Sequence, residues 1–88
     1  MKSSTRQSFW RHYWKLPKDV RSQARRLHRM FLKDPSHPSL AFKLIKPTNP
    51  PLYSVRLTLN YRALGLLRGD TVTWIWIGPH DEYERLIK

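Results

Sequence analysis

The sequence predicts an α+β domain: an N-terminal two-helix hairpin packed on one face of a small antiparallel sheet of three to four strands, then a short C-terminal helical turn. Two observations favour this fold class. Apolar residues follow a helical spacing in the first half of the chain, and they alternate with polar residues in the second half. The 88 residues suffice for one modest core, so we expect a single domain over residues 1–88.

The chain is strongly basic, with 17 Lys and Arg against 6 Asp and Glu. Residues 1–46 carry 12 basic and 2 acidic side chains, a net charge of +10, whereas residues 47–88 carry 5 and 4, a net charge of +1. A basic half favours an anionic partner, which can be a nucleic acid, an acidic protein or a membrane surface.

The composition also limits the location and the chemistry. There is no cysteine, no stretch near the ~18 apolar residues of a membrane span, and charge early in the N-terminal segment, unlike a secretory signal. We therefore expect a soluble cytoplasmic protein. His12, His28 and His37 lack the spacing of metal ligands, so we expect neither a metal site nor a cofactor.

The first predicted helix runs from about Arg6 to Lys15. Three hydroxyl side chains before it are available as N-caps: Ser3, Ser4 and Thr5. Four aromatic residues form a stripe at spacings of four: Phe9 with Tyr13, and Trp10 with Trp14. We assign this stripe to the core, with base stacking as the alternative.

The second predicted helix follows Leu16-Pro17, because a residue before proline leaves the helical region and Pro17 fits a first helical turn. Its apolar positions define one buried face: Val20, Ala24, Leu27 and Phe31. Basic side chains cover the rest of this helix. They form either a solvated face or a surface for phosphate or an acidic partner.

The remaining chain predicts strands and turns. Proline-rich loops at residues 34–40 and 46–52 flank a short apolar segment that predicts an edge strand. Alternation predicts further strands at residues 53–59, 61–68 and 71–78. Gly69-Asp70 predicts a two-residue hairpin turn between the last two.

The Gly69-Asp70 turn also predicts a register. On one face, large indoles pair with small residues, which favours close packing: Gly65 with Trp74, and Ala63 with Trp76. The other face then has two further pairs: Leu64 with Ile75, and Arg62 with Ile77.

For the preceding turn, we expect an odd loop at residues 58–60, which pairs Leu57 with Tyr61 and Arg56 with Arg62. An even loop would bring Arg62 level with Leu57 in the core, where a lone guanidinium is costly. The helix-covered face is then expected to hold eight side chains: Val55, Leu57, Tyr61, Ala63, Leu67, Val72, Trp74 and Trp76.

This register places Arg56 beside Arg62 on the face of the sheet that the helices leave uncovered. Like charges directly opposite each other are destabilising, so an anionic ligand is one candidate to offset them. Beyond the last strand, Gly78-Pro79 turns the chain and brings His80 and Tyr83 near the two arginines. We therefore expect an ionisable cluster beside a cationic patch.

Four segments in this order resemble the RelE/ParE superfamily of toxins from bacterial toxin–antitoxin operons: KLPKDVRSQA, DPSHPSL, YSVRLTLNYRALG and WIWIGPHDEYERLI. With the order of elements, the resemblance covers nearly the whole chain. The HDEY ending is more similar to the mRNA-cleaving branch than to the gyrase-inhibiting branch. Two departures stand out: Ser54 occupies a position where a basic residue is usual, and the usual first strand is expected to be truncated or missing before Arg6.

The resemblance implies a ribosome-dependent endoribonuclease, an mRNA interferase that inhibits translation. It cuts through attack of the ribose 2′-hydroxyl without a metal. Arg56 and Arg62 would hold the phosphate, His80 would act as general acid or base, Tyr83 would stack or share a proton, and Glu82 is a weaker base candidate. Structural alternatives remain open: Tyr83 folded onto the sheet, or Arg62 paired with Glu82 or Glu84.

The resemblance also implies partners. Flanking phosphates or ribosomal RNA would contact four basic residues: Lys43, Lys46, Arg25 and Arg29. An acidic antitoxin would form a hetero-oligomer with the chain by binding the basic helices and an apolar patch of four residues: Leu64, Leu66, Ile75 and Ile77. The alternative is that Leu86 and Ile87 of the chain itself cover this patch. A membrane role is disfavoured, since the apolar helix face is needed for the core. Two other functions stay open, a non-catalytic protein (a gyrase-type inhibitor or an inactive toxin) and a basic nucleic-acid-binding module.

Overall fold

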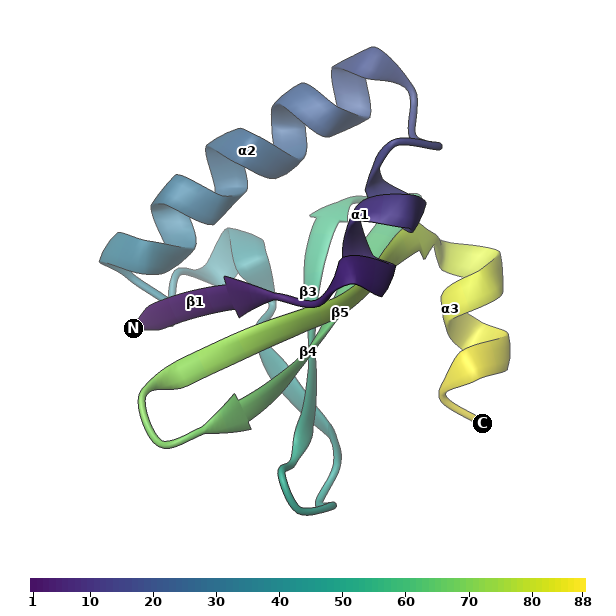
Figure 1. Ribbon diagram of the computed structural model, residues 1–88. Helices are drawn as coiled ribbons and strands as arrows, with labels where there is room; N and C mark the ends of the chain where they lie inside the picture. The colour runs from purple at the N-terminus through teal and green to yellow at the C-terminus, as the bar shows by residue number, and fades with distance from the viewer.

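The computed structural model describes residues 1–88 as three α-helices and a five-stranded sheet (Figure 1). In chain order the elements are β1 (Lys2–Thr5), α1 (Gln7–Tyr13), α2 (Lys18–Lys33), a 3-10 turn η1 (Pro38–Leu40), β2 (Lys43–Lys46), β3 (Leu52–Thr58), β4 (Tyr61–Arg68), β5 (Thr71–Pro79) and α3 (His80–Leu86). The strand order is β1-β5-β4-β3-β2. Only β1 runs parallel to its neighbour. None of the helices has both the length and the apolar character needed to cross a membrane.

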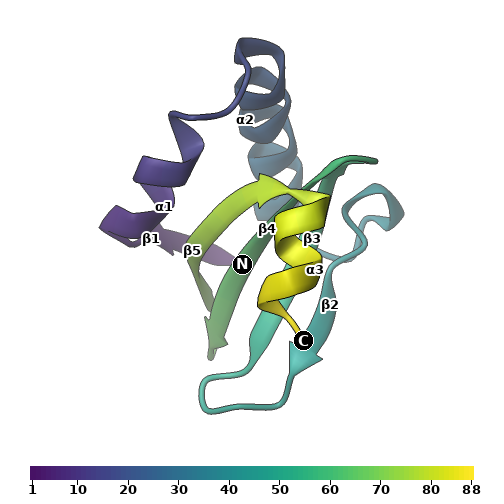
Figure 2. The same ribbon diagram turned by 90° about the vertical axis from the view of Figure 1, so that its right-hand side faces the viewer.

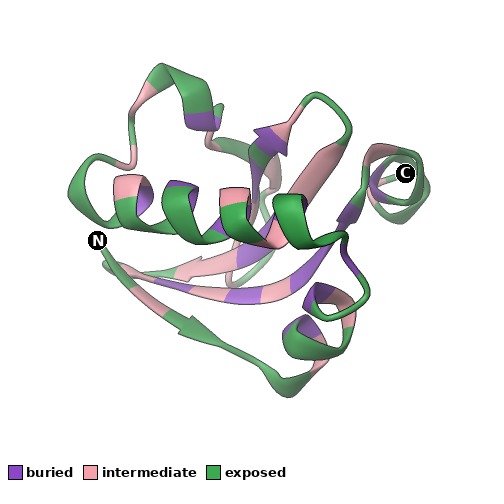
Figure 3. Cartoon of the chain, turned by 90° about the horizontal axis from the view of Figure 1, so that it is seen from above, coloured by how far each residue is buried: buried purple, intermediate pink, exposed green.

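The sheet separates two apolar clusters, so the α+β prediction is confirmed. The larger cluster, which we call the main core, consists of 14 buried residues and joins α1 and α2 to one face of the sheet. The predicted face of α2 is buried within it, while the outward positions of α2 are exposed (Figure 3). A smaller cluster on the other face joins Leu64, Trp76 and Tyr83 beneath α3. In Figure 2, α1 and α3 lie on either side of β5.

The N-terminal strand corrects two predictions. The hydroxyl residues that we expected to cap the first helix form β1 instead, and Arg6 occupies the cap position with no side-chain hydrogen bond. The first strand is therefore short but present. The sheet has five strands and is mixed, with β1 parallel to β5, rather than an antiparallel sheet of three or four strands. β1 pairs along β5 from Thr71 to Trp74, and Trp74 Nε1 donates to Ser3 Oγ over 3.1 Å. This pairing covers backbone groups that an edge strand would leave open.

The aromatic stripe of α1 divides between the core and the surface. Phe9 and Tyr13 are buried, as predicted. Trp10 and Trp14, in contrast, are 42% and 65% exposed. The helix also ends at Tyr13, two residues before the predicted end. The assignment of the stripe to the core is thus correct for one of its two pairs.

The second hairpin follows the predicted register only as far as Gly65. Gly65 lies opposite Trp74, and a Cβ at position 65 would lie 2.5 Å from Val72 Cγ1, so close packing requires glycine there. Beyond this point a β-bulge on β5 shifts the pairs to Leu64–Trp76, Ala63–Ile77 and Arg62–Gly78. The predicted pairs Ala63–Trp76, Leu64–Ile75 and Arg62–Ile77 are therefore wrong.

The bulge moves two side chains to the faces opposite those expected, because one extra residue inverts the alternation. Ile77 enters the main core at 2% exposure, and Trp76 packs beneath α3. A Cβ at Gly78 would lie 2.5 Å from Trp76 Cζ2, so this indole occupies space that only glycine leaves free. The other seven side chains predicted on the helix-covered face lie in the main core or against it.

The first hairpin has the predicted pair Arg56–Arg62 but a different turn. Thr58 pairs with Tyr61 around a two-residue loop, so the predicted pair Leu57–Tyr61 is wrong. A bulge at Leu57 supplies the extra residue that we expected in the loop. Leu57 stays buried, and Arg62 is directed away from the main core, as its charge requires.

Candidate functional site

The two arginines share the face of the sheet that carries α3. Side chains alternate along a strand, and Val55 and Ala63 belong to the main core. Arg56 and Arg62, one position away from them and opposite each other, therefore face the other side. Lys43, on β2, pairs with Ser54 on β3, the strand that carries Arg56. Lys43 therefore lies on the same face as the two arginines.

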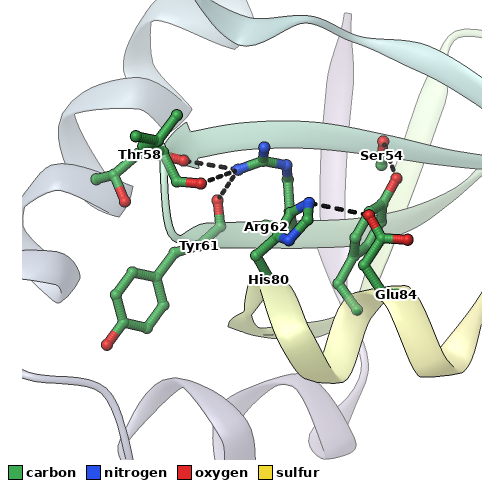
Figure 4. Close-up of polar contacts among 8 residues, drawn as sticks. Ser54, Thr58, Tyr61, Arg62, His80 and Glu84 are labelled. Carbon is green, nitrogen blue, oxygen red and sulfur yellow. Dashed lines mark hydrogen bonds and ion pairs between the residues drawn. The ribbon is translucent and has the colours of Figure 1, made fainter.

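Arg62 is held by the β3–β4 turn (Figure 4). Its Nη1 donates to the carbonyls of Thr58, Leu59 and Tyr61 at 2.7, 3.2 and 3.0 Å. Nε and Nη2 have no hydrogen-bond partner in the chain, so they remain available to an anion. Burial lowers the pKa of Arg62, and the like charge of Arg56 lowers it further. The side chain is thus a fixed, partly desolvated cation.

The same turn anchors His80. The backbone N–H of His80 donates to the carbonyl of Asn60 over 2.7 Å. Together with the three bonds to Arg62, every carbonyl of residues 58–61 accepts a hydrogen bond from the site. The start of α3 is therefore positioned by the turn that also holds Arg62.

His80 pairs with Glu84, one helical turn along α3. His80 Nε2 lies 3.0 Å from Glu84 Oε1, and the two side chains are 37% and 51% exposed (Figure 4). Neither Glu82 nor Glu84 forms an ion pair with Arg62, although the charge of Glu84 acts against the lowering of the Arg62 pKa. Glu84 is thus the acidic group of the site, which we did not select from the sequence; its i+4 spacing from His80 was the available signal.

Tyr83 packs onto the sheet, which was the structural alternative. It is 3% exposed, within the cluster of Leu64 and Trp76, and its hydroxyl lies 3.3 Å from Ser54 Oγ. In this buried position the ring is not accessible for stacking on a nucleobase. Ser54, the residue that departs from the resemblance, is buried as the hydrogen-bond partner of Tyr83.

The four predicted RNA-contacting residues divide between two surfaces. Lys43 is exposed and Lys46 is half-buried on β2, the edge strand beside β3. Arg25 and Arg29 are exposed on α2, which packs on the opposite face of the sheet from α3. The structure therefore groups Lys43 with Arg56 and Arg62 but separates Arg25 and Arg29 from His80.

The predicted apolar patch is not an open surface. Leu64 is covered beneath α3, Ile77 lies in the main core, and Ile87 packs against the smaller cluster. An apolar groove of about 500 Å³ lies instead between α1, α2 and β1. Trp10 and Trp14 line it from α1, and Arg25 lines it from α2. No three His, Asp or Glu side chains gather closely enough to hold a metal ion.

Three solved structures that share this fold come from a RelE toxin or from complexes of RelE with RelB. A chain of the RelB–RelE antitoxin–toxin complex from Methanococcus jannaschii gives a TM-score of 0.76 at 17% identity, covering 97% of this chain and 99% of that chain. A chain of the archaeal RelE–RelB complex from Pyrococcus horikoshii OT3 gives 0.72 at 15% identity, covering 89% and 92%. The isolated Escherichia coli RelE toxin gives 0.64 at 17% identity, covering 97% and 94%.

At these identities the likeness establishes the RelE fold and not the activity. A family model described as a ParE-like toxin domain matches residues 18–85, and the chain belongs to this family, within the RelE/ParE superfamily of toxins. A search of the curated proteins gave no match. The elements β1 and α1 precede the matched region and complete the fold by pairing with β5 and covering the main core.

Proposed function

We propose that this toxin is a ribosome-dependent, metal-independent endoribonuclease that cuts mRNA and inhibits translation in the cytoplasm. The observation that supports this proposal is the placement of His80 and Arg62 by one turn, with Arg56 opposite Arg62. A histidine and an arginine held by the same turn, with a second arginine paired across the sheet, combine a proton carrier with phosphate-binding cations. Residues 1–88 would act as one toxin domain.

The proposed reaction needs no group beyond RNA, water and these side chains. The ribose 2′-oxygen forms a bond to phosphorus, the bond from phosphorus to the 5′-oxygen breaks, and a 2′,3′-cyclic phosphate results. His80 moves a proton as general acid or base, while Arg56 and the free nitrogens of Arg62 stabilise the charge on the phosphoryl oxygens. Tyr83, buried on Ser54, would support α3 rather than take part in the chemistry.

The basic surfaces suggest how the RNA lies. We assign Lys43 and Lys46 to the phosphates that flank the cut, since β2 borders the strand of Arg56. Arg25 and Arg29, on the far side of the sheet, would contact ribosomal RNA. Arg25 donates one hydrogen bond, to the hydroxyl of Tyr13 at 2.7 Å, and has no acidic partner in the chain.

An acidic antitoxin is the proposed protein partner, in a toxin–antitoxin hetero-oligomer. Two structural neighbours are antitoxin–toxin complexes. The groove between α1 and α2 combines an apolar floor with Trp10, Trp14 and Arg25 at its edges, which suits an acidic segment with apolar side chains. We therefore propose this groove, rather than the patch under α3, as the binding site of the antitoxin.

One observation favours a second function. Three carbonyls already occupy Nη1 of Arg62, and Tyr83 is closed to substrate, so the site offers fewer free groups than its sequence predicts. A non-catalytic toxin that binds gyrase or another target fits this arrangement, as does an inactive toxin or a basic nucleic-acid-binding module.

Mapping of mRNA 5′ ends by primer extension separates these functions. The chain is induced without an antitoxin, beside an Arg62→Ala/His80→Ala variant whose folding is checked by circular dichroism. The proposal predicts new cuts that need translation and that are absent in the double variant. Growth arrest with intact mRNA would instead support a gyrase-type or other target.

A further inference from the structure

The contact between His80 and Glu84 determines which ring nitrogen carries hydrogen. Nε2 of His80 lies 3.0 Å from Glu84 Oε1 (Figure 4). An ionised carboxylate only accepts hydrogen bonds, so Nε2 must be the donor. A neutral imidazole has one donor and one acceptor nitrogen. In the neutral ring, Nδ1 therefore keeps its free lone pair.

No other acidic group holds the imidazole. Glu82 and Asp81 lie on the same helix and form no ion pair with His80. The strands beneath α3 contribute the cations Arg56 and Arg62, and the ring of Tyr83 lies 5.7 Å from that of His80. The remaining acids are on or after α2 and in the β4–β5 turn: Asp19, Asp34 and Asp70. The orientation of His80 therefore depends on Glu84.

We propose that Glu84 is a positioning residue that holds the proton of His80 on Nε2 and leaves Nδ1 as the catalytic base. This inference rests on the proposed nuclease function and assigns its base to one atom. Nδ1 takes the proton of the 2′-hydroxyl as the 2′-oxygen bonds to phosphorus. The Glu84 carboxylate stabilises the imidazolium that forms, as in carboxylate–histidine pairs generally. Water gives a proton to the departing 5′-oxygen, and the hydroxide that remains takes the Nδ1 proton, which restores the neutral ring with its hydrogen on Nε2.

A purely structural role for Glu84 leads to a different expectation. An exposed pair four residues apart on a helix contributes little to stability. If the pair only supports α3, its removal leaves both the tautomer-dependent chemistry and the fold nearly unchanged. The two roles are therefore distinguished by the state of the ring and by the cleavage rate, not by stability.

The experiment combines ¹⁵N NMR of the His80 ring in the full chain with translation-dependent mRNA cleavage. Three variants are compared with the unchanged protein: Glu84→Ala, Glu84→Gln and, as the matched acidic control on the same helix, Asp81→Ala. The amide oxygen of Gln accepts from Nε2 but carries no charge. Glu84→Gln thus separates the effect on the tautomer from the effect on the imidazolium.

We expect the Nε2–H form in the unchanged chain, in Glu84→Gln and in Asp81→Ala, and a mixture of both tautomers in Glu84→Ala. Cleavage should fall about 10- to 100-fold in Glu84→Ala, less than the roughly 10²- to 10⁴-fold that a general base contributes, because the base remains and only its orientation is lost. It should fall less in Glu84→Gln and stay unchanged in Asp81→Ala.

Two results would overturn the inference, for different reasons. If the protein is active and Glu84→Ala cuts as fast as Asp81→Ala, the positioning role is wrong and the nuclease function stands. A folded protein that holds the Nε2–H form but cuts no mRNA removes the nuclease function, and with it the role of Nδ1 as base.

Discussion

The backbone N–H of His80 donates to the carbonyl of Asn60 over 2.7 Å, joining the start of α3 to the β3–β4 turn. The neighbouring carbonyls of this turn accept from Arg62. One short turn therefore positions both the proposed proton carrier and the proposed phosphate-binding cation. Changes in the turn should affect stability and activity together, whereas changes at exposed site residues should affect activity alone.

Replacement of Arg62 by alanine should destabilise the fold as well as abolish cleavage. The substitution removes three hydrogen bonds to part-buried or exposed carbonyls and should lower the free energy of unfolding by about 1–3 kcal/mol. Urea denaturation measures this change. Arg56→Ala is the matched control, because Arg56 is exposed, and should stay within about 0.5 kcal/mol of the unchanged protein. Equal effects of the two substitutions would contradict the structural role of Arg62.

Substitution of Gly78 by alanine should cause overpacking against Trp76. The added Cβ would lie 2.5 Å from Cζ2 of the indole, so we expect a loss of about 1–3 kcal/mol. Thermal unfolding measures the loss. A second substitution, Trp76→Leu, removes the ring that clashes and should make Gly78→Ala nearly neutral in that background. An unchanged melting temperature for Gly78→Ala alone would show that the β5 bulge is placed differently.

Removal of the Tyr83 hydroxyl should leave cleavage intact. Tyr83→Phe loses only the 3.3 Å contact with Ser54 and should cost about 0.5–1.5 kcal/mol, whereas Tyr83→Ala leaves a cavity and should cost about 3–5 kcal/mol. Primer extension on the folded Tyr83→Phe variant tests the chemistry. Loss of cutting in that variant would place the hydroxyl in the reaction.

The protein should become less stable as the pH falls below the ordinary pKa of histidine, in part through His28. Desolvation of its imidazole lowers the pKa of His28 from 6.5, although much of the residue is exposed. Below pH 6.5 the unfolded chain therefore binds a proton that the folded chain resists, so stability decreases with acidification.

Chemical denaturation at pH 7 and pH 5 measures this dependence. The His28→Gln variant should lose less stability between the two pH values than the unchanged chain. In the unchanged chain, His28 Nε2 lies 2.9 Å from Ser3 Oγ, and the amide of the Gln introduced in His28→Gln can keep this hydrogen bond. The same pH dependence in both proteins would assign the effect to other groups.

Much of the fold follows from local patterns in the sequence. The apolar spacing of α2, the turn at Gly69-Asp70 and the pairing of Arg56 with Arg62 are confirmed. Arg62 lies outside the core as expected, although a two-residue turn with a bulge replaces the predicted odd loop. These features depend on periodicity, on turn residues and on the cost of a buried charge, all of which are read from neighbouring residues. Arg56 and Arg62 could therefore be paired in advance.

The features that the sequence left open depend on contacts between distant segments. A bulge on β5 exchanges the faces of Trp76 and Ile77. Its position depends on the packing of the Trp76 indole against Gly78. β1 forms because Lys2–Thr5 meets the free edge of β5, more than sixty residues away in the chain. The sequence by itself thus determined most of the elements, though not β1, together with the basic half and the pair of arginines. Only the tertiary structure decided that Tyr83 is buried, that Glu84 holds His80 and that the open apolar groove lies beside α1, because each is the outcome of packing between elements.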